Sequence, residues 1–136
     1  MRNRTTSRGA PRRSGLAATE LALALPVLAL LFQLTADYSR LFFALATLSD
    51  AARAGAMYYA TTTTATAPQI QAVALADASD LTSPTPTVVS TTGTDSAGNA
   101  TVKVTVSCSF TTLTPLPGVA SPVTLTRSMT MMPNPP

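Results

Sequence analysis

Residues 16–36 form a nearly unbroken apolar run. Its only clearly polar members within residues 16–36 are Thr19, Glu20, Gln33 and Thr35. About 20 helical residues cross a hydrocarbon core of roughly 30 Å, so the run is long enough to span a membrane. Pro26 lies inside it, and membrane helices tolerate an internal proline that would break many soluble ones. We therefore expect a transmembrane helix half over residues 16–36.

Beyond residue 36 the pattern becomes amphipathic instead of ending. Apolar or small residues recur at alternating spacings of three and four, which is typical of a stripe along one helix face. The stripe consists of Tyr38, Leu41, Leu45, Leu48, Ala52, Gly55 and Tyr59. The pattern predicts an amphipathic continuation over residues 37–60 and one helix over 16–60. At 1.5 Å per residue this helix is roughly 65 Å long, about twice the bilayer core, so it should stand out on the far side.

Charged residues fall mostly off this stripe. Asp37 with Arg40, and Asp50 with Arg53, have the i,i+3 spacing of surface ion pairs, each of which contributes only a few tenths of a kcal/mol. They indicate a solvated helix face.

The second half of the chain, residues 61–136, is rich in Thr, Ser, Ala and Pro. The Thr-rich stretch 61–67 ends the long helix because β-branched residues weaken helices, and Pro68 can begin a short one. We expect that helix over about 68–79, with Ile70, Val73 and either Asp77 or Leu75 facing its support. Strict alternation of apolar and polar residues predicts strands over about 87–92, 101–110 and 123–131.

Three short strands cannot bury both faces of a sheet by themselves. The apolar stripe of the long helix is the obvious cover for one face. We therefore predict an α+β fold, with a long N-terminal helix and a short second helix packed on a small antiparallel sheet.

The charge distribution changes the picture more than the net charge of +3 does. Five of the nine basic residues precede Ser14, and beyond it four basic residues face six acidic ones, a net charge of −2. Arginines on the N-terminal side of an apolar run place that end in the cytoplasm. The chain shows no basic face for phosphates, so we expect no nucleic acid partner.

Composition excludes several kinds of site. The chain has no histidine and one cysteine, Cys108, so it can form no intrachain disulfide and no Cys/His metal site. We expect no cofactor and no enzyme, because Asp77 and Asp80 are best read as solvated surface residues. Residues 95–99 indicate a hairpin turn and lack the acids of a calcium loop. Cys108 should act as a small hydrophobe on an inward strand face.

The carboxylate of Glu20 stands close to the start of the apolar run, five residues after Gly15. If a protease cut after Gly15, Leu16 would be the new N-terminus. Glu20 would then lie in the first turns of a helix, near the positive end of its dipole and a new α-amino group. Intramembrane carboxylates are functional candidates by default. The alternative is an uncleaved signal-anchored periplasmic binding or scaffold protein in which Glu20 is incidental.

Two motifs carry a resemblance to a known family. The basic tip, Gly15, Glu20 and the apolar helix resemble the class III signal of type IV pilins. "GLAATELALALPVLALLF" followed by "DYSRLFFALATLSDAARAGAMYYA" resembles the TadE-like pseudopilins of the Flp (Tad) pilus machinery, over about residues 12–60. The matching positions are Gly15, Glu20, Ala22, Leu23, Leu25, Pro26, Ala51, Ala52, Arg53, Gly55, Ala56, Tyr59 and Ala60.

The resemblance implies a pilin-like fold and a minor pilin that acts in pilus assembly or initiation. Residues 1–15 would be a leader removed by a prepilin peptidase at Gly15–Leu16, and Glu20 would set the register as helices bundle. Other pilins, the assembly platform and membrane lipid would be its partners. It would cross the bacterial inner membrane once, with residues 61–136 in the periplasm. Whether it enters the extracellular fibre is left open.

Overall fold

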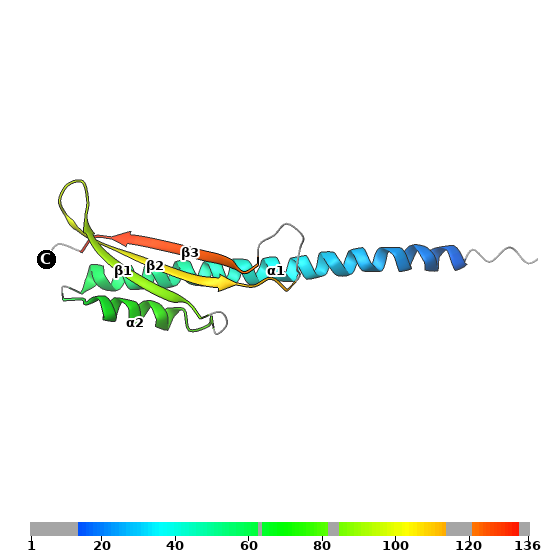
Figure 1. Ribbon diagram of the computed structural model, residues 1–136, viewed down its shortest axis with the longest axis horizontal. Coiled ribbons are helices and arrows are strands. Elements are labelled where there is room, and N and C mark those ends of the chain that lie inside the picture. Colours follow the sequence, from blue (N-terminus) through cyan, green and yellow to red (C-terminus); the bar gives the residue numbers. More distant parts are fainter. Residues whose placement is uncertain (1–13, 63, 82–84, 114–120, 134–136) are drawn as a thin grey trace, which may run out of the picture.

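The computed structural model describes residues 14–62, 64–81, 85–113 and 121–133. One helix, α1 (Ser14–Thr61), dominates it and contains Pro26. Its 48 residues give a length of about 72 Å. The expected helix over 16–60 is therefore present, and it is a single element (Figure 1). The expected basic leader lies almost wholly outside the described residues.

A short helix, α2 (Ala67–Asp77), follows α1 and runs back beside it (Figure 1). Its start is fixed by the side chain of Gln69, whose Oε1 accepts a hydrogen bond of 3.0 Å from the backbone N–H of Thr66. This satisfies one of the donors that a helix N-terminus leaves without a partner. Ile70 and Ala74 are buried and Val73 is half-buried, so α2 turns one apolar face inward. The expectation that Leu75 or Asp77 joins this face is wrong: both are exposed, and Ala74 takes the inward position one turn after Ile70.

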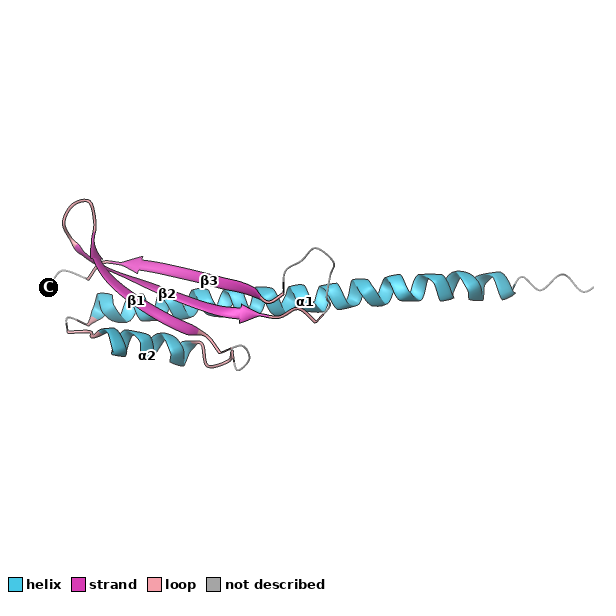
Figure 2. Cartoon of the chain, viewed as in Figure 1, coloured by secondary structure: helices cyan, strands magenta, loops and turns pink. Residues whose placement is uncertain are grey.

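The three strands are β1 (Thr87–Thr94), β2 (Ala100–Phe110) and β3 (Val123–Met131). They form one antiparallel sheet in the order β1-β2-β3 (Figure 2). The pairing is continuous, one residue against one, along both ladders. On β2 the predicted alternation is present, with every second residue buried: Val102, Val104, Val106, Cys108 and Phe110.

The turn between β1 and β2 is held by the carboxylate of Asp95. Its Oδ1 accepts hydrogen bonds from the backbone N–H groups of Ala97 (2.9 Å) and Asn99 (2.8 Å). Gly98 supplies a φ of +84°, which side chains rarely adopt. The hydrogen bond from the Asn99 side chain, together with those backbone bonds, lowers the pKa of Asp95. The expected hairpin turn is confirmed.

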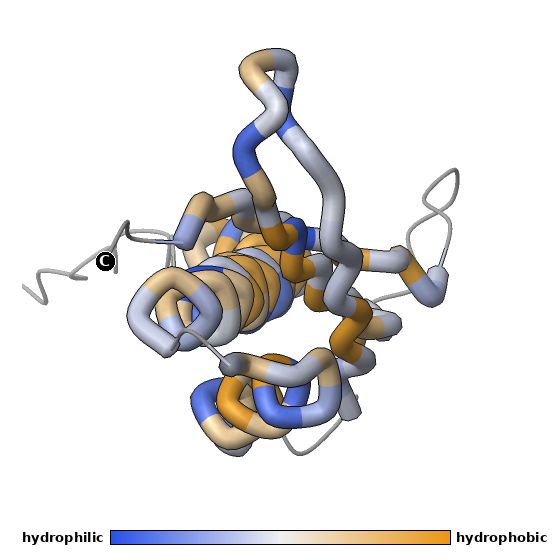
Figure 3. The backbone as a smooth tube through the Cα atoms, turned by 90° about the vertical axis from the view of Figure 1, so that its left-hand side faces the viewer, coloured by the Kyte–Doolittle hydropathy of each residue, from blue (hydrophilic) through white to orange (hydrophobic). Residues whose placement is uncertain are grey.

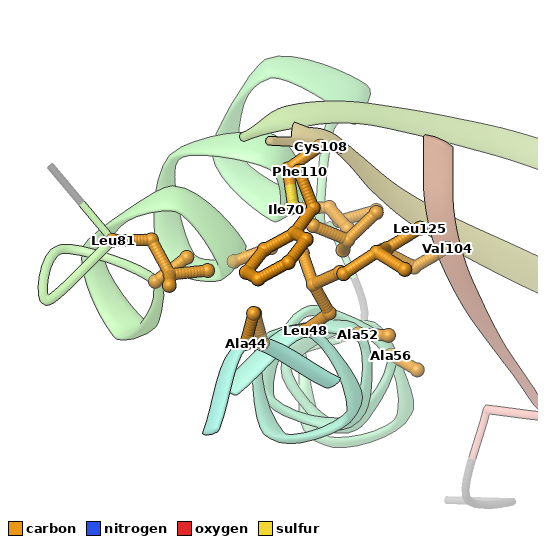
Figure 4. Close-up of a cluster of buried hydrophobic side chains, with 14 of the residues drawn as sticks. Ala44, Leu48, Ala52, Ala56, Ile70, Leu81, Val104, Cys108, Phe110 and Leu125 are labelled. Carbon is orange, nitrogen blue, oxygen red and sulfur yellow. The ribbon is translucent and has the colours of Figure 1, made fainter. Parts of the chain in front are cut away.

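Both helices pack on the same face of the sheet (Figure 3). The core lies between α1, α2 and the inward side chains of β2, with contributions from β3 (Figure 4). Its fully buried members are mostly small, which allows the helices and the sheet to approach closely. The α+β fold with a long helix covering a small sheet is therefore confirmed.

The two halves of α1 have different surroundings. All residues from Gly15 to Gln33 are exposed, and burial begins at Leu34. The sheet and α2 lie along the second half, while the first half projects beyond them (Figure 1). The exposed stretch of residues 15–33 is about 28 Å long at 1.5 Å per residue, close to the thickness of a hydrocarbon core. Within the described residues, α1 is the one helix long and apolar enough to cross a membrane.

The helices α1 and α2 lie close together at Gly55. A Cβ added there would lie 3.1 Å from Cβ of Ala74, 3.2 Å from the carbonyl oxygen of Ile70 and 3.3 Å from Cγ1 of Val104. One of these neighbours is the α2 backbone, which cannot rotate away as a side chain can.

We therefore expect Gly55→Leu to force α2 away from α1 and to lower the free energy of unfolding by about 1–3 kcal/mol, the usual cost of overpacking. The measurement is urea unfolding of the full chain in detergent. Ala46→Leu, on the exposed side of the same helix, is the control and should change stability by about 0.5 kcal/mol or less. Equal stability of the two variants would contradict this packing.

Cys108 faces the core and is 4% exposed. Burial raises the pKa of its thiol, so less of the reactive thiolate is present at neutral pH.

We expect a thiol-specific reagent to modify Cys108 slowly in the folded protein and rapidly in denaturant. The measurement is the rate of modification by mass spectrometry across a urea titration, and the rate should rise with unfolding. Modification of the folded protein at the unfolded rate would show that β2 does not bury this face.

Candidate processing site and membrane-exit junction

The predicted scissile bond, between Gly15 and Leu16, lies in the first turn of α1. The first four N–H groups of a helix lack partners within it, so this turn opens more easily than the turns in the helix interior. Leu16 is 66% exposed, and a Cβ placed at Gly15 would meet no atom within 4 Å. The bond is therefore accessible among the described residues, and cutting there stays a prediction.

Glu20 is exposed on the apolar half of α1, four residues beyond Leu16. Four residues make slightly more than one helical turn, a rise of about 6 Å. Among the described residues no hydrogen bond or ion pair engages its carboxylate. A new α-amino group on Leu16 would lie about one turn away, and the register role of Glu20 also stays a prediction.

The predicted interface stripe lies largely under the sheet. Leu48, Ala52 and Gly55 are buried, and Leu41, Leu45 and Tyr59 are partly buried against the core. Tyr38 departs from this pattern, since it is 61% exposed. The physical reason is its side of the helix: at this level packing covers the side of Asp37, which is buried, and leaves the side of Tyr38 open.

The spacing of Asp37 and Arg40 predicts a surface ion pair, but the carboxylate of Asp37 has another role in the structure. Asp37 is 7% exposed, and its Oδ1 accepts a hydrogen bond of 2.9 Å from the backbone N–H of Leu113, 76 residues away in sequence. Nη1 of Arg40 lies 3.5 Å from the same oxygen, a weak contact by its length. The Arg40 guanidinium also lies 5.4 Å from the centre of the Phe110 ring, within the range of a cation–π interaction.

Asp37, Arg40, Phe110 and Leu113 lie where the exposed half of α1 meets the α+β domain, which consists of the second half of α1, α2 and the sheet. We call these four residues the membrane-exit junction. The partner of Asp37 is a backbone N–H after β2, and such a donor has no signature in sequence. The one available signal was an aspartate at the boundary between two apolar segments. The matching pair, Asp50 and Arg53, is exposed and forms no ion pair in the described structure.

The described residues that were candidates for catalysis or metal binding do not form a cluster. Asp77 and Asp80 are both exposed, at and beyond the end of α2. Within the described ranges no group of three or more His, Cys, Asp or Glu residues is placed to hold a metal ion.

The comparison with family models bears on α1. Its residues from Gly15 to Met57 match the model described as TadE-like protein. Residues 15–57 are a TadE-like domain. The TadE-like domain covers the exposed apolar half of α1 and most of the part of α1 that lies under the sheet. It makes up less than half of the whole chain. It includes Glu20, Asp37 and Gly55. No curated protein and no solved structure matches the chain.

The junction generates a prediction about stability. Asp37→Ala removes the acceptor of the Leu113 N–H and the carboxylate beside Arg40. This hydrogen bond is part-buried and its acceptor is a carboxylate; hydrogen bonds to charged groups contribute about 1.5–3 kcal/mol, so unfolding in urea should begin at lower concentration. The Leu113 amide should also exchange its hydrogen faster.

Asp50→Ala is the matched control, because it removes an exposed carboxylate from the same helix. It should change stability by about 0.5 kcal/mol or less. If the two variants unfold alike and Leu113 exchanges at the wild-type rate, Asp37 does not hold the junction.

Proposed function

We propose that this protein is a minor pilin, or pseudopilin, of a bacterial Flp (Tad) pilus. It is processed by a prepilin peptidase and acts in pilus assembly or initiation by helix bundling. The TadE-like family implies an association with this pilus system. One observation carries the proposal. The TadE-like domain lies on α1, and the length of the exposed apolar half of this helix is close to the thickness of a bilayer core.

The proposed topology is a single pass through the inner membrane, with the N-terminus in the cytoplasm. It is supported by the arginines that precede the apolar half of α1. The sheet and α2 pack along the other half of this helix. The small α+β domain therefore stands on the periplasmic side.

Processing after Gly15 would convert the helix start into an assembly signal. Glycine at the cut lets the backbone approach a peptidase closely, since no Cβ stands in the way. The new α-amino group of Leu16 and the carboxylate of Glu20 would carry opposite charges about one turn apart. In a low-dielectric bundle such charges attract strongly, within one chain or between neighbours, and so favour one axial register.

Extraction from lipid requires a new cover for the apolar half of α1. No described part of the chain covers residues 15–33. Other helices of the same kind supply a matching apolar surface, and the domain stays at the periphery because it packs on the far half of the helix only. Other pilins and the assembly platform are thus the proposed partners, besides the peptidase and lipid.

The intact mass of the protein extracted from membranes tests the processing step. We expect a chain that begins at Leu16 in cells that contain the peptidase and one that begins at Met1 in cells without it. A chain beginning at Met1 in both would reject processing and favour the uncleaved periplasmic anchor.

Glu20→Ala tests the register role separately. Cutting should survive, because the scissile bond is unchanged, while pilus assembly should fail, because the carboxylate that sets the register is gone. Piliation counted by electron microscopy is the measurement. Asp50→Ala controls for the loss of a carboxylate elsewhere on α1, and normal piliation of Glu20→Ala would reject the role.

A further inference from the structure

Exposed aromatic side chains gather on α1 just beyond its apolar half. Tyr38, Phe42 and Phe43 are 61%, 64% and 55% exposed, and the rings of Tyr38 and Phe42 stack with centroids 6.4 Å apart. Among the described residues beyond the apolar half of α1 and away from this end, the other exposed large apolar side chains are Met57, Leu75, Val89 and Met132. Those lie on different elements, so the gathering at the membrane-exit end is specific to that place.

The three aromatic residues lie on the side of α1 that the sheet leaves open. At about 100° per residue, Tyr38 and Phe43 are roughly 140° apart around the helix, with Phe42 between them. Asp37 and Ala44 point the other way and are buried. The aromatic surface is thus held in place by packing on the opposite side of the helix.

A second segment brings an apolar side chain to the same level. Leu113 follows β2 and is 56% exposed. Its backbone N–H is bonded to Asp37, one residue before Tyr38, which fixes its height along α1. Two segments far apart in sequence therefore present exposed apolar side chains at one level of the helix.

Along α1, the distance from Glu20 to the level of Tyr38 is close to the thickness of the hydrocarbon core of a bilayer. The 18 residues from Glu20 to Tyr38 rise about 27 Å, against a hydrocarbon thickness of roughly 30 Å. Phe42 and Phe43 lie about 6–8 Å further along, the depth of one headgroup layer. Aromatic residues are enriched at this level of membrane proteins because their rings suit the boundary between apolar and wet surroundings.

We propose that Tyr38, Phe42, Phe43 and Leu113 form a collar that binds the headgroup layer on the outer side of the bilayer. The inference rests on the proposed membrane anchoring of α1. The collar sets the depth of the helix, so that Glu20 is held at the opposite interface, where a carboxylate costs far less than at the bilayer centre. It also seats the membrane-exit junction directly on the lipid surface.

The chain contains no tryptophan, so a single introduced indole reports its own depth. The full-length variants Phe42→Trp, Leu113→Trp, Leu28→Trp and Met57→Trp are reconstituted at low density into phosphatidylcholine–phosphatidylglycerol vesicles. The lipids carry bromine either near the headgroup or near the bilayer centre. Leu28 marks the middle of the span, and Met57, exposed on the same helix beyond the collar, is the matched control.

We expect the fluorescence of the two collar variants, Phe42→Trp and Leu113→Trp, to be blue-shifted and quenched more by shallow bromine than by deep bromine. The fluorescence of the mid-span variant, Leu28→Trp, should be quenched most by deep bromine. The fluorescence of the control variant, Met57→Trp, should be quenched only by aqueous acrylamide.

Three results would overturn the collar. If the mid-span variant is quenched by bromine while both collar variants behave like the control, the collar is rejected and the anchoring stands. If the mid-span variant is not quenched, the anchoring itself fails, and the collar fails with it. If Phe42→Trp is open to acrylamide in vesicles while Leu113→Trp is shielded, lipid does not cover the aromatic surface, which is left for a protein partner, and the lipid collar is rejected.

Discussion

The structure depends on one mismatch of lengths. The helix α1 has 48 residues, but the rest of the described chain covers only its second half. Burying an apolar side chain such as Leu stabilises by about 1.5–3 kcal/mol relative to leaving it in water. A stretch of some twenty mostly apolar residues left in water is therefore untenable, and something outside the described chain must cover it. Lipid does so in a membrane and other helices do so in a bundle, and a TadE-like domain is consistent with both.

The covered half of the helix explains how so small a domain holds together. Alanines and Gly55 line the buried side of α1, which lets α2 and β2 approach until a single added methyl group would crowd three neighbours. Larger side chains such as Leu48, Ile70 and Phe110 fill the remaining space (Figure 4). At the end nearest the exposed half, polar contacts take over, with Asp37 joining the helix to the chain after β2. The sheet and α2 are thereby held against α1 at two places, around Gly55 and around Asp37.

The periodic elements could be predicted from sequence because each carries its own period. The seven-membered stripe predicted the long helix, and the alternation from Val102 to Phe110 predicted β2, since both patterns follow from which side chains face a core. Asp37 could not be placed in this way. Its partner is a backbone N–H that carries no residue identity, and its neighbour Arg40 has the ordinary spacing of a surface pair. Tyr38 fitted the stripe by spacing, yet its exposure depends on which side of α1 is covered at that level, which periodicity does not encode.

The most direct test of the account is external protease digestion of spheroplasts, followed by mass spectrometry of the fragment that the membrane retains. A single span with the domain outside, cut after Gly15, predicts a fragment that begins at Leu16 and ends between residues 35 and 66. An intact chain protected from external protease would contradict the topology. A retained fragment that begins at Met1, in cells that contain the peptidase, would contradict the processing on which the pilin assignment depends.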